Sequence, residues 1–150
     1  MSAATAFQKV ILALHAALAK EPALAGGRVF INRMRPLAAS DATAIVVRLE
    51  GTRGRESVLG ARDWTTLISV ECYGRTVGAT TAEAAADALV AAAWTRLAAL
   101  QAPDLGLMEI GVESEIDWLR DADATSEVCV VIRLTATHRT PYESLTPWPT

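Results

Sequence analysis

The chain has 150 residues and a mass of 15.9 kDa, enough for one domain that needs no metal or disulfide to hold it together. Its 14 basic and 17 acidic side chains give a formal net charge of −3, which excludes a general attraction to nucleic acid or to anionic membranes. Two cysteines are too few for a disulfide framework, and we expect both Cys72 and Cys129 to be buried as small hydrophobic side chains.

No apolar stretch is long enough to cross a membrane, and the first residues lack the basic and apolar regions of a signal peptide. We therefore expect neither a membrane partner nor export, and place the protein in the cytoplasm of the cell that makes it.

The first element is predicted to be an amphipathic helix. Apolar residues recur at helical spacing from Phe7 to Leu18, and Thr5 and Gln8 have the spacing of a capping box. The glycine pair at 26–27 ends the helix. Away from the apolar stripe the helix is mostly alanine, which suggests contact with something beyond its own sheet.

Three strand-like segments follow, at residues 28–33, 44–50 and 64–73. The second and third each have one apolar face and one mixed face, as in an antiparallel sheet that is covered on one side. Between them, residues 51–63 contain three glycines and three arginines with almost no periodicity. We interpret this segment as a long hairpin loop.

A second helix is predicted over residues 81–100, with Thr80 and Glu83 as its capping box. Two further strands follow, at 107–118 and 127–137, and Gly111 and Ser114 indicate a β-bulge in the first of them. The order α-β-β-β-α-β-β predicts an α+β fold, in which a mostly antiparallel sheet carries both helices on one face. We assign residues 1–140 to this single domain.

Residues 141–150 contain three prolines and are predicted to form an extended segment, the C-terminal arm. Tyr142, Leu145 and Trp148 are apolar anchors on this arm. Two interpretations stay open, because the arm can fold back on its own domain or dock on another chain.

The residues offer little support for catalysis. His15 and His138 have no metal-ligand spacing and are expected to be ordinary surface or edge histidines. The sequence contains no nucleophile elbow and no phosphate-binding loop before a helix. We therefore predict no enzyme activity, no cofactor and no metal site.

The densest charge is an acidic run between residues 109 and 123 that recurs at the period of a strand. Its members are Glu109, Glu113, Glu115, Asp117, Asp121 and Asp123. The period favours a solvated strand face, which also discourages edge-to-edge aggregation. An acidic docking surface is a second interpretation, and a Mg²⁺-dependent hydrolase that uses Glu113 and Asp117 is a third.

The predicted loop at 51–63 carries a second candidate contact group, consisting of Arg53, Arg55, Glu56 and Arg62. Phosphate binding by the arginines is conceivable, but the interleaved acids and the lack of aromatic residues weaken a nucleic-acid role. A solvated hairpin tip is the simplest interpretation. The more specific interpretation is that Arg53 and Arg55 pair with Glu113 and Glu115 of a neighbouring copy.

The whole arrangement resembles a known family of virion proteins. An N-terminal helix precedes the strand RVFINRMRP, and the strands AIVVRLEG and WTTLISVECYG flank a long polar segment. The helix AADALVAAAWTRLAAL, an acidic strand and the long strand VCVVIRLTATHRTP follow. In size and element order the chain is similar to the tail terminator proteins of long-tailed bacteriophages, the lambda minor tail protein U-like group.

This resemblance implies a structural role in a phage or prophage virion, assembled in the bacterial cytoplasm. Family members form hexameric rings on the end of the tail tube, stop its polymerisation and present a surface to the head. The expected partners are therefore further copies of the chain, the tail-tube protein and the head–tail connector, and a monomer in dilute solution is compatible with this role. Another neck role, as a tail completion or head–tail joining protein, is the alternative. Tyr142 and Trp148 of the C-terminal arm are candidate contacts that the family does not explain.

Overall fold

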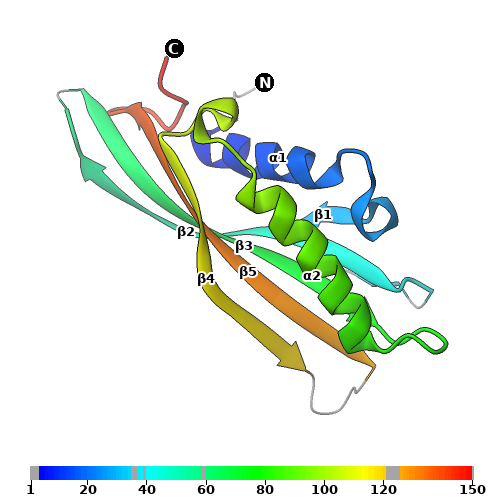
Figure 1. Ribbon diagram of the computed structural model, residues 1–150. Helices are drawn as coiled ribbons and strands as arrows, with labels where there is room; N and C mark the ends of the chain where they lie inside the picture. The colour runs from blue at the N-terminus through cyan, green and yellow to red at the C-terminus, as the bar shows by residue number, and fades with distance from the viewer. Residues whose placement is uncertain (1–3, 35–36, 39, 59, 121–125, 150) are drawn as a thin grey trace.

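The computed structural model describes residues 4–34, 37–38, 40–58, 60–120 and 126–149. They form one five-stranded sheet with two α-helices on one of its faces (Figure 1). In chain order the elements are α1 (Ala6–Ala19), η1 (Leu24–Gly27), β1 (Val29–Ile31), β2 (Thr43–Glu56), β3 (Ala61–Arg75), α2 (Ala82–Ala98), η2 (Ala102–Leu105), β4 (Glu109–Arg120) and β5 (Glu127–Pro141).

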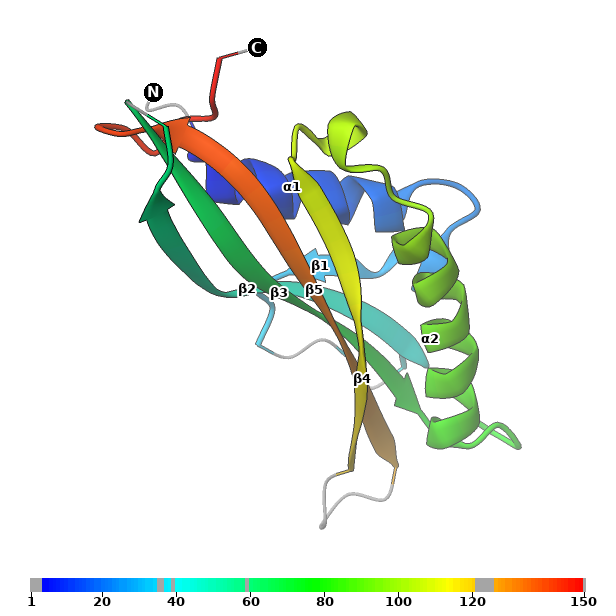
Figure 2. The ribbon, with the colours of Figure 1, turned by 60° about the vertical axis from the view of Figure 1, so that its left-hand side comes forward.

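The strand order across the sheet is β1-β2-β3-β5-β4. Only the short β1–β2 pair is parallel, and the other three pairs are antiparallel. The α+β class and the mostly antiparallel sheet are therefore confirmed, with two short 3₁₀ helices added to the expected order. The long strands twist strongly along their length (Figure 2).

The core lies between the helices and the central strands. Val10, Leu14 and Leu18 of α1 are buried against the sheet. On the sheet side the core consists of alternate residues of three strands, namely Ile45, Val47, Ile68, Val70, Cys72, Val130, Ile132 and Leu134. None of these helices is long and apolar enough to cross a membrane, within the part of the chain that the structure describes.

Both helices begin at a threonine cap. The Thr5 Oγ1 accepts a hydrogen bond from the Gln8 backbone N–H at 3.2 Å, as the sequence predicts. For α2 the predicted cap is wrong by one residue, because Thr81 accepts from the Ala84 backbone N–H at 3.1 Å. Thr80 instead pairs with Val77 in the turn before the helix.

The contact between α2 and β3 depends on small residues. An added Cβ at Gly74 of β3 would lie 2.4 Å from the backbone oxygen of Ala82 and 2.5 Å from the backbone nitrogen of Ala86. Both contacts are with main-chain atoms of the helix, which cannot move aside independently. Glycine at this position therefore lets α2 lie directly on the strand.

The predicted loop at 51–63 is wrong over most of its length. β2 continues to Glu56 and β3 already begins at Ala61, so these residues extend the hairpin as paired strands. The extension is stabilised from its other side, since β3 pairs with β5 as far as Ala61 opposite Pro141. A register shift between Leu49 and Gly51 marks where the extension begins.

Candidate subunit-contact surfaces

One edge of the sheet is basic. β1 pairs with β2 only over Ile45–Val47, and within the described residues no strand pairs with the outer edge of β2 beyond that point. Arg53 and Arg55 are exposed along this free edge. No hydrogen bond or ion pair with another described residue engages either guanidinium. The Arg55 charge nevertheless helps to lower the pKa of Asp63, which lies opposite it across the hairpin.

The other two members of the predicted basic group lie on a different face. Glu56 and Arg62 are opposite each other across β2 and β3, two strand positions from Trp64. Because side chains alternate along a strand, they project to the helix side, whereas Arg53 and Arg55 project to the opposite, helix-free face. The Arg62 guanidinium stacks over the Tyr142 ring at 4.7 Å. The four residues thus form two separate contact groups.

An ion pair that the sequence does not indicate lies near the tip of this extension. Asp63 is only 5% exposed, and its carboxylate accepts from Arg139 Nε at 2.6 Å and from Nη2 at 3.1 Å. Arg139 also donates to the Ser57 hydroxyl at 3.1 Å. The hydrogen bonds from Arg139 hold the pKa of Asp63 below its ordinary value. Asp63 is therefore a structural acid.

The opposite edge of the sheet is acidic and is interrupted by a bulge. Val112 pairs with Leu134 and Ile116 with Ile132, so the three residues 113–115 face a single residue of β5. This confirms the bulge that the sequence indicates near Gly111 and Ser114. The bulge interrupts the alternation only locally, because Val112 and Ile116 on either side of it both lie opposite core-facing residues of β5, as expected.

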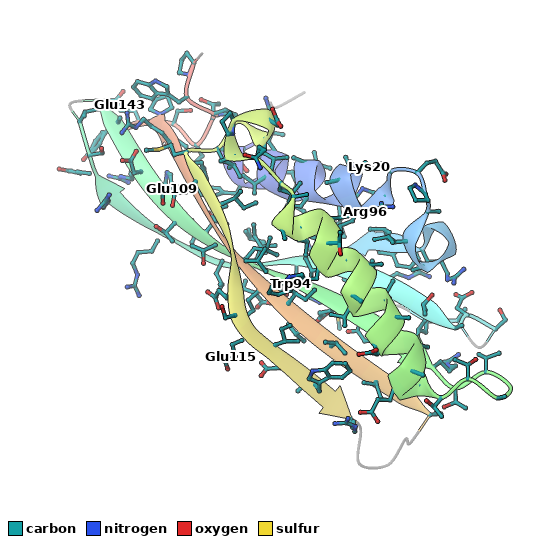
Figure 3. All side chains as sticks on the ribbon, in the orientation of Figure 1. Lys20, Trp94, Arg96, Glu109, Glu115 and Glu143 are labelled. Carbon is teal, nitrogen blue, oxygen red and sulfur yellow. The ribbon has the colours of Figure 1, made fainter. Side chains whose placement is uncertain are left out.

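The acidic side chains around the bulge differ in their partners. Glu113 accepts from the Thr135 hydroxyl at 3.2 Å, and Asp117 accepts from Arg133 Nη1 at 2.5 Å. Glu115 is exposed and, in the described chain, has no ion-pair partner (Figure 3). Glu109 is also exposed, near the start of the same edge strand (Figure 3). Asp121 and Asp123 lie outside the described residues.

The basic and acidic groups lie on opposite edges of one sheet. Two strands, β3 and β5, lie between β2, which carries the arginines, and the edge strand β4, which carries the acidic side chains. Among the described residues no ion pair joins Arg53 or Arg55 to Glu113 or Glu115. The predicted pairing of these groups is therefore not made within one chain. Arg53, Arg55 and Glu115 are exposed, whereas Glu113 is half-buried.

The C-terminal arm folds back on its own domain, which is one of the two predicted alternatives. The Leu145 carbonyl accepts from the Ala6 backbone N–H at 2.8 Å, and the Trp148 N–H donates to the Arg139 carbonyl at 3.1 Å. Tyr142, Leu145 and Trp148 nevertheless stay 48%, 47% and 41% exposed. The arm thus adds apolar surface to this end of the molecule.

The expectation for His138 is wrong. It lies on the central strand β5 and is only 3% exposed, against the Phe7 ring at a centroid distance of 5.2 Å. Its Nε2 is hydrogen bonded to Thr66 Oγ1 at 2.8 Å, and burial lowers its pKa. His15 Nε2 lies 2.8 Å from the Val29 carbonyl oxygen and helps join α1 to β1.

The remaining reactive groups are unsuited to nucleophilic chemistry. Burial raises the pKa of the Cys72 thiol to about 12 and that of Cys129 to about 11, so both stay protonated at neutral pH. Cys72 is fully buried as expected, whereas Cys129 is only partly buried. In the described ranges of the chain, no three histidine, cysteine or acidic side chains gather to hold a metal ion.

No protein-family model and no curated protein matches this sequence.

Proposed function

We propose that this chain is a structural protein of a bacteriophage or prophage tail, of the tail terminator type. It forms a ring on the end of the tail tube, terminates polymerisation of the tube and provides the surface to which the head attaches. The proposal assigns it no catalytic step. Its partners are other copies of the chain, the tail-tube protein and the head–tail connector, and its place is the virion.

The observation that carries the proposal is the opposite charge of the two sheet edges. Arg53 and Arg55 occupy one edge without an ion pair, and Glu113 and Glu115 belong to the bulge at the other, where Glu115 is exposed and Glu113 is bonded to Thr135. Two different, complementary edges favour head-to-tail contacts, in which the basic edge of one copy lies against the acidic edge of the next copy. When the rotation closes, such contacts produce a ring, and the charges select the correct neighbour.

The bulge supports a ring joined by side chains. Three residues opposite one interrupt the hydrogen-bonding edge of β4, which discourages uncontrolled addition of further strands. Of the two glutamates in the bulge, Glu115 is exposed, whereas Glu113 accepts a hydrogen bond from Thr135 of β5. A contact made by charged side chains, without strand pairing, suits a protein that assembles into a closed ring with a fixed number of subunits.

The acidic-site hydrolase is less well supported. Arg133 binds the carboxylate of Asp117, and Thr135 donates to Glu113, so neither acid is free to act as a general base without losing its partner.

Native mass spectrometry and light scattering over a concentration series test the proposal. We expect a hexamer, either in concentrated solution or on added tail tubes, and electron micrographs with one tube end decorated. If the protein instead binds the head side of a completed neck and leaves the tube ends bare, the chain has the alternative role of a tail completion or head–tail joining protein. A chain that stays monomeric and binds no tube end would contradict the proposal.

A further inference from the structure

A cleft of about 450 Å³ lies at the end of the molecule where the two termini meet. The start of α1, the turn that contains η2 and the C-terminal arm gather there (Figure 1). The walls of the cleft are largely apolar and include Val10, Leu105, Leu107 and Trp148. This size and lining are typical of sites for small ligands.

The charge of the cleft is opposite to that of the chain as a whole. Three lining residues carry ionisable groups, namely Lys9, His138 and Arg139, and none of the lining residues is acidic. Arg139 is engaged by Asp63 and Ser57. Lys9 is exposed at the rim and forms no ion pair with a described residue. In a protein with a net charge of −3, this cleft therefore favours an anion.

His138 provides a buried hydrogen-bonding group beside the cleft. Its Nδ1 is buried and has no hydrogen-bond partner, whereas Nε2 is held by Thr66 Oγ1. Thr66 Oγ1 lies 3.0 Å from Thr52 Oγ1. When Thr52 donates to Thr66 and Thr66 donates to Nε2, the neutral ring carries its proton on Nδ1. A buried N–H without an acceptor is costly, and a ligand oxygen would remove that cost.

We propose that this cleft binds an apolar ligand that carries a single carboxylate. The carboxylate accepts a hydrogen bond from His138 Nδ1 and faces the Lys9 ammonium. The apolar body packs on Val10, Leu107 and the indole of Trp148, which belongs to the C-terminal arm. Binding of such a ligand holds the arm against the domain, because the arm forms one wall of the site.

Octanoate is the probe, and 1-octanol and octylammonium are the matched controls. In calorimetric titration of the full chain we expect saturable binding of octanoate and about tenfold or more weaker binding of both controls. Tryptophan fluorescence reports the cleft, and the ¹⁵N shift of His138 Nδ1 should move on saturation with octanoate. Octanol that binds as tightly as octanoate, or octanoate that does not saturate, would overturn the proposal.

Lys9 of α1 and Lys20, the residue that caps the C-terminus of the same helix, give a matched pair of variants. Lys9→Gln should weaken octanoate binding about twofold to fivefold, as expected for a charge at a solvent-exposed rim. Lys20→Gln, at the far end of α1, should leave it unchanged (Figure 3). His138→Leu should weaken binding about tenfold if its melting curve stays cooperative. Equal affinities for the wild type and Lys9→Gln would contradict the carboxylate assignment even if His138→Leu fails to fold.

Discussion

Arg53 and Glu109 lie at the two ends of one row of residues that crosses four strands of the sheet. Thr65 and Thr137 are the two residues between them in the row. Arg53 and Glu109 also line a common cleft on the helix-free face. The row shows how one sheet carries positive charge at one edge and negative charge at the other, with small neutral side chains between. In the proposed ring, the basic edge of one copy would lie beside the acidic edge of the next.

Charge reversal at the two edges tests the proposed head-to-tail contact. The variant Arg53→Glu/Arg55→Glu should remain monomeric, because both of its edges are then acidic. The variant Glu113→Arg/Glu115→Arg should also remain monomeric, because both of its edges are basic. An equimolar mixture should recover the ring, since every edge then meets an edge of opposite charge in an alternating assembly. Light scattering of each variant alone and of the mixture provides the measurement.

A control variant separates edge charge from general surface charge. Arg62→Gln removes an arginine of the same hairpin that stacks over Tyr142 on the helix side, so it should leave ring formation by the edges intact. Added salt should weaken the wild-type ring, because exposed charges are screened. Rings formed by either reversal variant alone would show that these four residues do not determine the contact.

The helices and the core strands could be predicted from local patterns. The stripe from Phe7 to Leu18 predicts α1, and alternation in β2 and β3 predicts the strands on either side of the hairpin. Gly111 and Ser114 correctly indicate the bulge in β4. Each of these signals lies within about ten residues, which is the range over which a periodic pattern can be recognised.

The hairpin extension and the buried polar contacts depend on distant parts of the chain. Residues 51–56 have few β-forming side chains, and they become a strand because β3 pairs with them and is itself paired with the end of β5. Asp63 and Arg139 are 76 positions apart, and no spacing rule connects them. His138 is buried because Phe7, at the other end of the chain, covers it. Local patterns carry no information on such contacts.

Gly74 is predicted to be essential for the packing of α2 on β3. Gly74→Ala places a methyl group against the backbone of Ala82 and Ala86, so the helix must move away from the strand. We expect a loss of about 1–3 kcal/mol in the free energy of unfolding, measured by urea titration. Gly111→Ala is the control, because an added Cβ there meets no atom within 4 Å. Equal stabilities of the two variants would contradict this role.

His138 should make stability depend on pH in the mildly acidic range. Burial lowers its folded-state pKa below the ordinary value of 6.5, so the unfolded chain binds the proton more readily. The free energy of unfolding should therefore fall as the pH drops below about 6.5, and this contribution should be constant above about pH 7.5. Urea unfolding of the wild type and His138→Gln between pH 5 and pH 8, about the range over which an unperturbed histidine changes charge, provides the measurement.

The informative quantity is how steeply the free energy of unfolding changes with pH in the wild type and in His138→Gln, and not its absolute value. His138→Gln should lower stability at every pH, because it disturbs the contact with Thr66, but its stability should fall less steeply towards pH 5. Direct titration of the His138 ring by NMR should give a midpoint below 6.5 in the folded chain. An identical slope for the two proteins, or a midpoint above 6.5, would contradict the assignment.

Trp148→Ala should affect assembly more than folding. The indole is 41% exposed, and the main-chain hydrogen bonds that hold the C-terminal arm, at Ala6 and Arg139, do not require it. We therefore expect a loss of about 1 kcal/mol or less in the free energy of unfolding, because only part of the ring is removed from water. The yield of rings should fall by a larger factor, since an exposed aromatic anchor contributes most when a partner buries it. Melting curves and light scattering on the same samples distinguish the two effects. A large fall in melting temperature with an unchanged ring yield would show that Trp148 serves only its own domain.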